Sequence, residues 1–223
     1  MISDTKVVAI GGGTGLSTML KGLKLHTHNI TAVVTVADDG GSSGILRSDL
    51  GMLAPGDVRN CVSALAEVDP VMGELLNFRF KDGSLKGHSL GNLFLAALNE
   101  TSSSFDEAVK KFSHLTGVVG TVYPVTNESV TLSALLEDGR LIEGESHIGV
   151  HHDGPKNGIV KLMVNPEKPK AVDGVIKALE KADIIVLGPG SLYTSIIPNL
   201  LVDGVVDAIK KSNAVKIYVC NIM

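Results

Sequence analysis

The sequence predicts an α/β protein with a doubly wound, mostly parallel sheet, and three observations carry this prediction. A short apolar run at 6–10 ends directly at the glycine-rich segment 11–15, and apolar residues then recur at helical spacing through 16–23. A second run, rich in β-branched residues, follows at 30–36. Strand, glycine loop, helix and strand in this order form the opening unit of a Rossmann-like fold.

The segment after the second strand differs in composition from its neighbours. Residues 37–57 include five glycines, three serines and four aspartates, with little periodicity. This composition predicts an irregular functional loop rather than a linker, because strong elements lie on both sides of it. Four helices are expected after the loop, the first with Asp57 as its N-cap. They cover residues 57–67, 71–80, 90–100 and 105–115.

A small antiparallel β-rich insertion is expected at 117–165, inside a single domain that spans 1–223. The segment Glu137-Asp138-Gly139-Arg140 indicates a hairpin turn between two of its strands. The strand-like runs of the insertion cover 118–125, 130–137, 141–148 and 159–164. The α/β pattern then resumes, and a buried strand at 183–187 leads into a second glycine loop at 188–191. The remaining elements are helices at 171–181 and 205–211 and a final strand at 215–219.

Composition and charge limit the function classes. The 223 residues are 44% hydrophobic, and 20 Lys and Arg stand against 24 Asp and Glu, for a net charge of −4. A nucleic-acid-binding protein needs a basic face, so this balance argues against a nucleic-acid partner. No apolar run is long enough to cross a membrane and the N-terminus lacks a signal-peptide pattern, so we expect a cytoplasmic protein. Of the two cysteines, Cys61 lies in an apolar helical run and is expected to be buried.

The first candidate binding site is the glycine loop after the first strand. A loop between a strand end and a helix start gathers backbone N–H groups, and the helix dipole adds partial positive charge, so a phosphate binds well there. We expect glycines at this place because they permit positive φ and the close approach of a ligand. The loop matches the first two glycines of the dinucleotide-binding fingerprint but has a leucine where the third glycine is expected, and this disfavours an NAD site. A tight turn without a ligand is the alternative. The residues are Gly11, Gly12, Gly13, Thr14 and Gly15.

The second candidate site is the acidic, hydroxyl-rich segment after the second strand, where an open α/β sheet has its ligand crevice. Carboxylates here can accept hydrogen bonds from ribose or hold a divalent ion such as Mg²⁺, and the serines can donate to anions. A polar surface turn is the alternative. A separate cluster, His151-His152-Asp153, is interpreted as a loop feature, because adjacent histidines in a strand point to opposite faces. The residues of the second site are Asp38, Asp39, Ser42 and Ser43.

Two shorter segments add further polar groups. Asp57, Arg59 and Asn60 at a helix start can bind a sugar or a phosphate, and an N-cap beside a solvated arginine is an equally supported alternative. His88 and Asn92 would share a helix face if that turn is helical, and could then bind phosphate or transfer a proton. A lone histidine is more often structural, so no catalytic residue is assigned.

The last candidate site is the second glycine loop and the hydroxyl groups that follow it. Gly188 and Gly190 repeat the arrangement in which a glycine loop follows a buried strand. Ser191 and Thr194 offer hydroxyl groups to a phosphate, and Tyr193 can stack on a base or cover the ligand.

Five motifs together resemble one family across the whole chain. They resemble the YvcK-type gluconeogenesis factors of the CofD-like superfamily, which also contains the phospho-lactate transferase of deazaflavin coenzyme synthesis. Five ordered motifs are specific, whereas a lone glycine loop would not be. The motifs are Gly-Gly-Gly-Thr-Gly-Leu-Ser at 11–17, Asp-Asp-Gly-Gly-Ser-Ser-Gly at 38–44, Pro-Gly-Asp-Val-Arg-Asn at 55–60, His-Ser-Leu-Gly-Asn at 88–92 and Gly-Pro-Gly-Ser-Leu-Tyr-Thr-Ser at 188–195.

The resemblance implies a Rossmann-like fold with one site built from these five segments. For the YvcK branch it implies binding of a nucleotide sugar, above all UDP-N-acetylglucosamine, and a role in carbon metabolism, cell shape and envelope synthesis without an established reaction. For the transferase branch it implies transfer of a nucleotidyl-activated phospho-lactate to a deazaflavin, with a divalent metal. If a reaction occurs, we expect Asp38 and Asp57 to bind the metal or to activate the acceptor. A nicotinamide oxidoreductase is the third and weakest hypothesis. The sequence leaves open a homo-oligomer and a regulatory protein partner.

Two departures from the family pattern stand out. Similar proteins continue beyond the last predicted strand, so we expect this chain to be C-terminally truncated and to lack part of the nucleotide-sugar pocket. Ile45 stands where relatives are expected to carry a basic residue, so one phosphate contact is expected to be weaker, which leaves Arg47 and Arg59 for this role.

Overall fold

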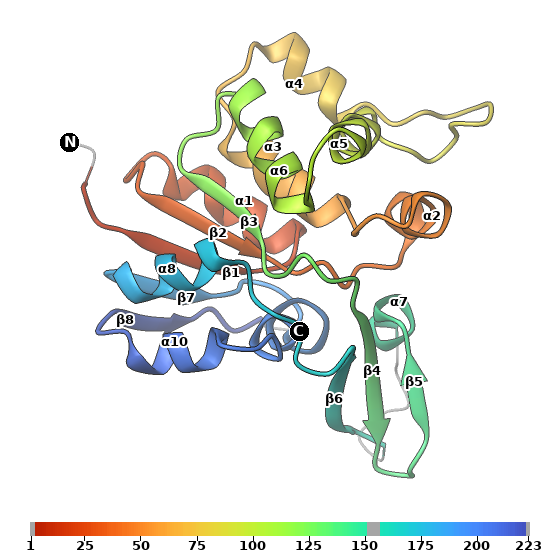
Figure 1. Cartoon of the computed structure of the whole chain (residues 1–223), viewed down its shortest axis with the longest axis vertical. Coiled ribbons are helices and arrows are strands. Elements are labelled where there is room, and N and C mark those ends of the chain that lie inside the picture. Colours follow the sequence, from red (N-terminus) through yellow and green to blue (C-terminus); the bar gives the residue numbers. More distant parts are fainter. Residues whose placement is uncertain (1–2, 151–156, 222–223) are drawn as a thin grey trace.

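Five parallel strands form the main sheet of the protein (Figure 1). The structure is a computed structural model and describes residues 3–150 and 157–221. The strands are β1 (Val7–Gly11), β2 (Ile30–Val34), β3 (Thr121–Pro124), β7 (Ile184–Leu187) and β8 (Val215–Tyr218). Their order across the sheet is β3-β2-β1-β7-β8, so β1 is central and all five strands end at the same edge. The predicted doubly wound, Rossmann-like α/β class is confirmed.

Helices cover both faces of this sheet and form a core on each face. Alternate side chains of β1 point into these two cores. Val7 and Ala9 pack in the larger core, whereas Val8 and Ile10 pack in the smaller one. Figure 1 shows α3 and α6 on one side of the sheet and α10 on the other. The larger core is covered by α1 (Thr14–Leu23), α3 (Gly56–Leu65), α5 (Leu90–Glu100) and α6 (Phe105–Leu115), and the smaller by α8 (Asp173–Lys181) and α10 (Val205–Lys211).

Serine caps explain why two helices begin where the sequence predicts them. Ser89 Oγ accepts the backbone N–H of Asn92 at 3.2 Å and opens α5, and Ser104 Oγ accepts that of Glu107 at 3.4 Å and opens α6. Both helices have the predicted bounds. The predicted helix at 71–80 is shorter in the structure, where α4 spans Pro70–Asn77.

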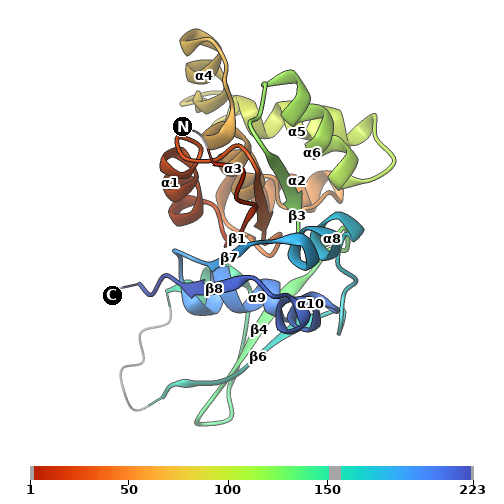
Figure 2. The same cartoon turned by 90° about the vertical axis from the view of Figure 1, so that its left-hand side faces the viewer.

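A second, antiparallel sheet projects away from the main sheet in both views (Figures 1 and 2). It contains β4 (Thr131–Leu136), β5 (Leu141–Glu143) and β6 (Ile159–Asn165), in the order β5-β4-β6. Gly139 adopts a φ of 85° in the predicted hairpin turn between β4 and β5. The strand β3 pairs in parallel with β2, so it belongs to the main sheet. The antiparallel part is therefore narrower than the predicted range 117–165.

The segment 37–57 is more ordered than its composition predicts, because it contains the helix α2 (Gly41–Leu50). Ser42 and Ser43 are buried on this helix, and a Cβ at Gly44 would collide with the carbonyl of Asp39. The small residues reflect close packing rather than an irregular loop. Asp57 is not an N-cap, since α3 begins one residue earlier at Gly56 and Asp57 lies in its first turn.

The predicted strand at 141–148 ends early. Gly144 adopts a φ of 98°, which stops β5, and the helix α7 (Glu145–Gly149) follows. The cluster His151-His152-Asp153 lies outside the described residues. None of the helices in the described ranges combines the length and the apolar character that a membrane crossing requires.

Candidate functional site

Both glycine loops open into one hollow at the edge where β1 and β7 end. The two strands are neighbours and parallel, so the loops that follow them leave the sheet side by side. We call this cavity of about 470 Å³ the glycine-loop hollow. Seven of the predicted site residues line it, namely Gly13, Thr14 and Gly15 of the first loop, Asp38 and Asp57, and Gly190 and Ser191 of the second loop. Its lining residues are Gly13, Thr14, Gly15, Asp38, Asp57, Glu145, Pro189, Gly190, Ser191, Ser195 and Asn221.

Close packing, rather than positive φ, requires glycine in the first loop. A Cβ at Gly12 would lie 2.7 Å from Ser195 Oγ, and one at Gly15 would lie 2.5 Å from the Pro189 carbonyl oxygen. A Cβ at Gly13 would collide with the Asp57 carboxylate, although the backbone at Gly13 is right-handed with φ −85°. The expectation of positive φ is therefore wrong for these glycines. The loop is tight because two other segments press against it.

A buried amide holds the two loops together. Asn199 Nδ2 donates to the carbonyl oxygen of Gly11 at 3.2 Å and to that of Ser195 at 2.8 Å. Asn199 lies in the short helix α9 (Ile197–Leu200), directly after the π-helical turn η2 (Leu192–Ile196). Asn199 was not predicted, since it lies outside the glycine motifs, whereas Ser195 is the last residue of the motif at 188–195 but was not named as a site residue. Cys61 is buried beneath the same loop, as predicted, and its thiol donates to the Gly12 carbonyl at 3.7 Å.

Three carboxylates act on one another at the hollow. Burial above all, together with the charges of Asp38 and Glu145, raises the pKa of Asp57 to about 7, although the Gly13 N–H and Arg59 act to lower it. Burial also raises the pKa of Glu145, although a hydrogen bond from the Thr194 hydroxyl lowers it. Near neutral pH this wall of the hollow therefore carries a carboxyl group that is part protonated. Glu145 was missed because the sequence pattern placed it inside a strand.

Asp38 and Asp39 are adjacent but have different roles. Asp38 lines the hollow, and its Oδ1 accepts the Gly40 N–H at 3.0 Å. Both oxygens of Asp39 instead accept backbone N–H groups at the start of α7, from Glu145 and Ser146, each at 2.9 Å. Asp39 was predicted to bind the ligand but does not line the hollow, because its carboxylate accepts the N–H groups at the start of α7.

Four predicted site residues form a buried polar network that is not part of the hollow's lining. Ser42 Oγ lies 3.0 Å from Nδ1 of His88 and accepts a hydrogen bond from Asn92 Nδ2 at 3.1 Å. Arg59 donates from Nε to Asn92 Oδ1 at 3.3 Å and from Nη1 to Asn77 Oδ1 at 2.9 Å. His88 precedes α5, so it meets Asn92 through Ser42 rather than by sharing a helix face. The network joins α2, α3, α4 and α5.

The remaining predicted residues lie around these two groups. Ser43 Oγ accepts the Gly56 N–H at 3.1 Å, and a Cβ at Gly13 would lie 2.9 Å from Asn60 Nδ2. Tyr193 is 38% exposed and does not line the hollow. Gly188 has a φ of 91° and packs near the Val219 carbonyl oxygen, so it shapes the second loop.

The described residues contain no group of three or more His, Cys, Asp and Glu side chains placed to hold a metal ion. Asp38 and Asp57 supply the hard oxygen donors that Mg²⁺ prefers, but Mg²⁺ needs about six ligands. The residues fit this ion only if phosphate oxygens of a ligand and water complete its shell.

Comparison with known proteins agrees with this architecture. A family model described as 2-phospho-L-lactate transferase CofD matches residues 7–223. A relative from Thermoanaerobacterium thermosulfurigenes is 58% identical over 222 residues, which cover 100% of this chain and 69% of the relative. The gluconeogenesis factor of Bacillus subtilis is 47% identical over 98% of this chain and 68% of its own length. A further relative, from Clostridium acetobutylicum, is 54% identical, and the chain spans only 49% of its length.

A crystal structure of a UPF0052-family protein from Bacillus halodurans matches with a TM-score of 0.93 and 46% identity, over 99% of this chain and 70% of that one. The sequence, the fold and the arrangement of the glycine loops thus lead to one assignment. The chain belongs to the CofD family and, within it, to the group of gluconeogenesis factors.

Proposed function

We propose that the chain binds a nucleotide sugar, UDP-N-acetylglucosamine in the first place, in the glycine-loop hollow. As a gluconeogenesis factor it would then act in carbon metabolism, cell shape and envelope synthesis as a sensor rather than as a catalyst. The observation that carries the proposal is the convergence of both glycine loops on one cavity. The names of relatives such as that from Bacillus subtilis support the role in gluconeogenic growth.

The chemistry of the hollow suits a diphosphate joined to sugars. Backbone N–H groups of the loop at the start of α1 and the hydroxyls of Ser191 and Ser195 can donate to phosphate oxygens. Asp38 and Glu145 can accept hydrogen bonds from sugar hydroxyls. The volume of about 470 Å³ lies within the usual range for small-molecule sites, about 300–1,000 Å³.

A thermal-shift titration tests this proposal. UDP-N-acetylglucosamine at about one hundred times its Kd should stabilise the fold by about 2.7 kcal/mol and raise Tm by several degrees. GDP and NADH are the comparison ligands and should give smaller shifts. Equal shifts with all three ligands, or none with any of them, would contradict specific nucleotide-sugar binding.

A second candidate function rests on Asp57. A carboxyl group with a pKa of about 7 is suited to accept a proton from an attacking hydroxyl. In a phospho-lactate transferase-like reaction, a deazaflavin hydroxyl would attack the activated phosphorus, the bond to the nucleoside monophosphate would break, and Asp57 would take the hydroxyl proton. Bound Mg²⁺ would supply charge neutralisation at the phosphates. Release of the monophosphate with a deazaflavin acceptor and magnesium tests this function, and absence of turnover counts against it.

The pH dependence of ligand affinity should follow the ionisation of Asp57. Its raised pKa means that the carboxyl group is neutral below about pH 7 and charged above it. Without a divalent cation, affinity for a nucleotide diphosphate sugar should fall as pH rises from 6 to 8, because the charged carboxylate repels the phosphates. Binding should then take up protons. With Mg²⁺ the trend should reverse, because the ion binds the charged form.

Isothermal titration of the wild type and of Asp57→Asn at three pH values measures this effect. Asp57→Asn should bind with nearly constant affinity between pH 6 and 8. The matched control is Asp49→Asn, at an exposed position near the end of α2, which should keep the wild-type slope. A wild-type slope in Asp57→Asn would show that another group is responsible.

A further inference from the structure

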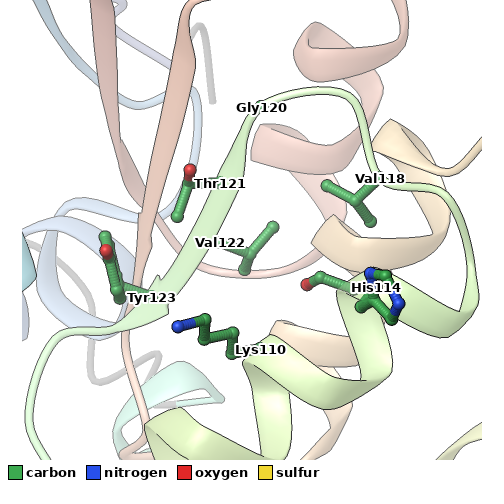
Figure 3. Close-up of a pocket in the computed structure, with 8 residues that line it drawn as sticks. Lys110, His114, Val118, Gly120, Thr121, Val122 and Tyr123 are labelled. Carbon is green, nitrogen blue, oxygen red and sulfur yellow. The ribbon is translucent and has the colours of Figure 1, made fainter.

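Two hollows flank the edge strand β3, one on each face of the main sheet. The first lies between β3 and α6 and has a volume of about 330 Å³; Figure 3 shows Lys110 extending from the helix toward the strand. The second has a volume of about 310 Å³ and lies on the face of α8. Gly120 and Thr121 belong to both. The two hollows therefore share one short stretch of backbone.

The backbone edge of β3 is open between these hollows. Within the described residues β3 pairs only with β2, which makes it the outermost strand. Val125 N–H donates to the Val34 carbonyl at 2.9 Å, so by alternation the backbone groups of Val122 and Pro124 face away from β2. Proline has no N–H. The open edge thus offers one donor and one acceptor at Val122 and one acceptor at Pro124.

Both hollows carry positive charge. Lys110 lines the first, and Lys6 and Lys181 line the second. None of the described residues that line either hollow is a carboxylate, although the chain as a whole has a net charge of −4. Asp183 lies beside the second hollow, where its Oδ2 accepts the Lys6 N–H. The edge of β3 is therefore a basic strip on an acidic protein.

We propose that this edge binds an extended, acidic segment of a partner protein, which adds to the main sheet as a sixth strand beside β3. Alternate side chains of an added strand point to opposite faces of the sheet. Acidic side chains on one face would point toward Lys110, and those on the other would point into the hollow that Lys181 lines. A small anion would occupy one hollow only, whereas a strand explains why the two hollows share an open edge. The lysines also disfavour pairing with a neutral strand.

The position of this edge separates it from the glycine-loop hollow. Lys6, Thr31 and Gly120 lie where β1, β2 and β3 begin, whereas the glycine loops follow the ends of β1 and β7. A partner bound at β3 would leave the nucleotide-sugar site open, so the protein would hold ligand and partner at the same time.

Fluorescence anisotropy with a labelled seven-residue peptide, Thr-Glu-Glu-Val-Glu-Glu-Thr, tests the proposal on the whole chain. The peptide places glutamates on both faces of a strand. Its binding should weaken about tenfold when glutamine replaces glutamate, and about tenfold when alternate peptide nitrogens are methylated, since methylation removes donors and leaves the charge. Lys110→Gln and Lys181→Gln should each weaken binding about threefold, and their combination about tenfold.

The matched control is Lys86→Gln, which lies in the exposed segment between α4 and α5 and should change affinity less than twofold. Equal binding of the glutamine peptide would overturn the electrostatic part of the proposal. Full binding of the methylated peptide would overturn strand addition. Lysine variants no weaker than Lys86→Gln would show that the peptide binds elsewhere.

Discussion

Replacing Gly13 with alanine should weaken nucleotide-sugar binding at least about tenfold, which is about 1.4 kcal/mol. The new Cβ would collide with the Asp57 carboxylate and lie 2.9 Å from Asn60 Nδ2. Because the backbone at Gly13 is right-handed, alanine meets no backbone strain there. The collision is with a side chain that can turn, so the fold should persist while Asp57 moves into the hollow and takes space from the ligand.

Isothermal titration with UDP-N-acetylglucosamine measures the loss of affinity, and circular dichroism checks the fold. Gly22→Ala is the matched control, because a Cβ at Gly22 meets nothing within 4 Å on the same helix α1. That variant should bind normally and gain about 0.5–1 kcal/mol of stability from the better helix former. Wild-type affinity in Gly13→Ala would place the ligand away from this loop.

Arg59→Met should lower the free energy of unfolding by about 2–4 kcal/mol. The Arg59 side chain is only 7% exposed, and its loss would leave Asn92 Oδ1 and Asn77 Oδ1 without their donor. Burial and the nearby charge of Arg79 lower the pKa of Arg59, whereas Asp57 raises it. The variant also removes a cation that favours the charged form of Asp57, so the pKa of Asp57 should rise further.

Guanidinium denaturation measures the change in stability. Arg79→Met is the matched control, since it makes the same substitution at an exposed arginine whose charge acts on Arg59. We expect that control to cost less than about 0.5 kcal/mol. If both variants lost the same stability, the buried network would not be the source of the effect.

Local sequence patterns predicted the bounds of an element correctly where the residues of that element determine them. The helices α5 and α6 combine a serine cap with apolar spacing, and both have the predicted bounds. The strand β1 is buried throughout and ends at glycine, so its position could also be predicted from the sequence. In these cases the information lies within about ten neighbouring residues.

The elements that were predicted wrongly form because of tertiary packing rather than because of local sequence. The helix α2 contains two glycines within a serine-rich run, and it forms because Ser42, Ser43 and Leu46 are buried against other segments. The short helix α7 begins with N–H groups bound to Asp39, more than one hundred residues earlier in the chain. No local pattern around Glu145 records that contact.

The candidate site was predicted as one group of motif residues and is two groups in the structure. Asp38 and Asp57 reach the hollow, whereas His88 and Asn92 lie in the buried network. Sequence motifs identify polar residues in a special environment, but a ligand contact and a buried hydrogen bond use the same residue types. Spacing along the chain could not separate these two uses.

The adjacent carboxylates of Asp38 and Asp39 connect the hollow to the antiparallel sheet. A single peptide unit links the residue that lines the hollow to the residue that holds the start of α7. The helix in turn carries Glu145 back to the hollow and follows β5 in the chain. Displacement of Asp38 by a ligand would therefore act, through the adjacent Asp39, on the start of the helix that follows the antiparallel strand β5.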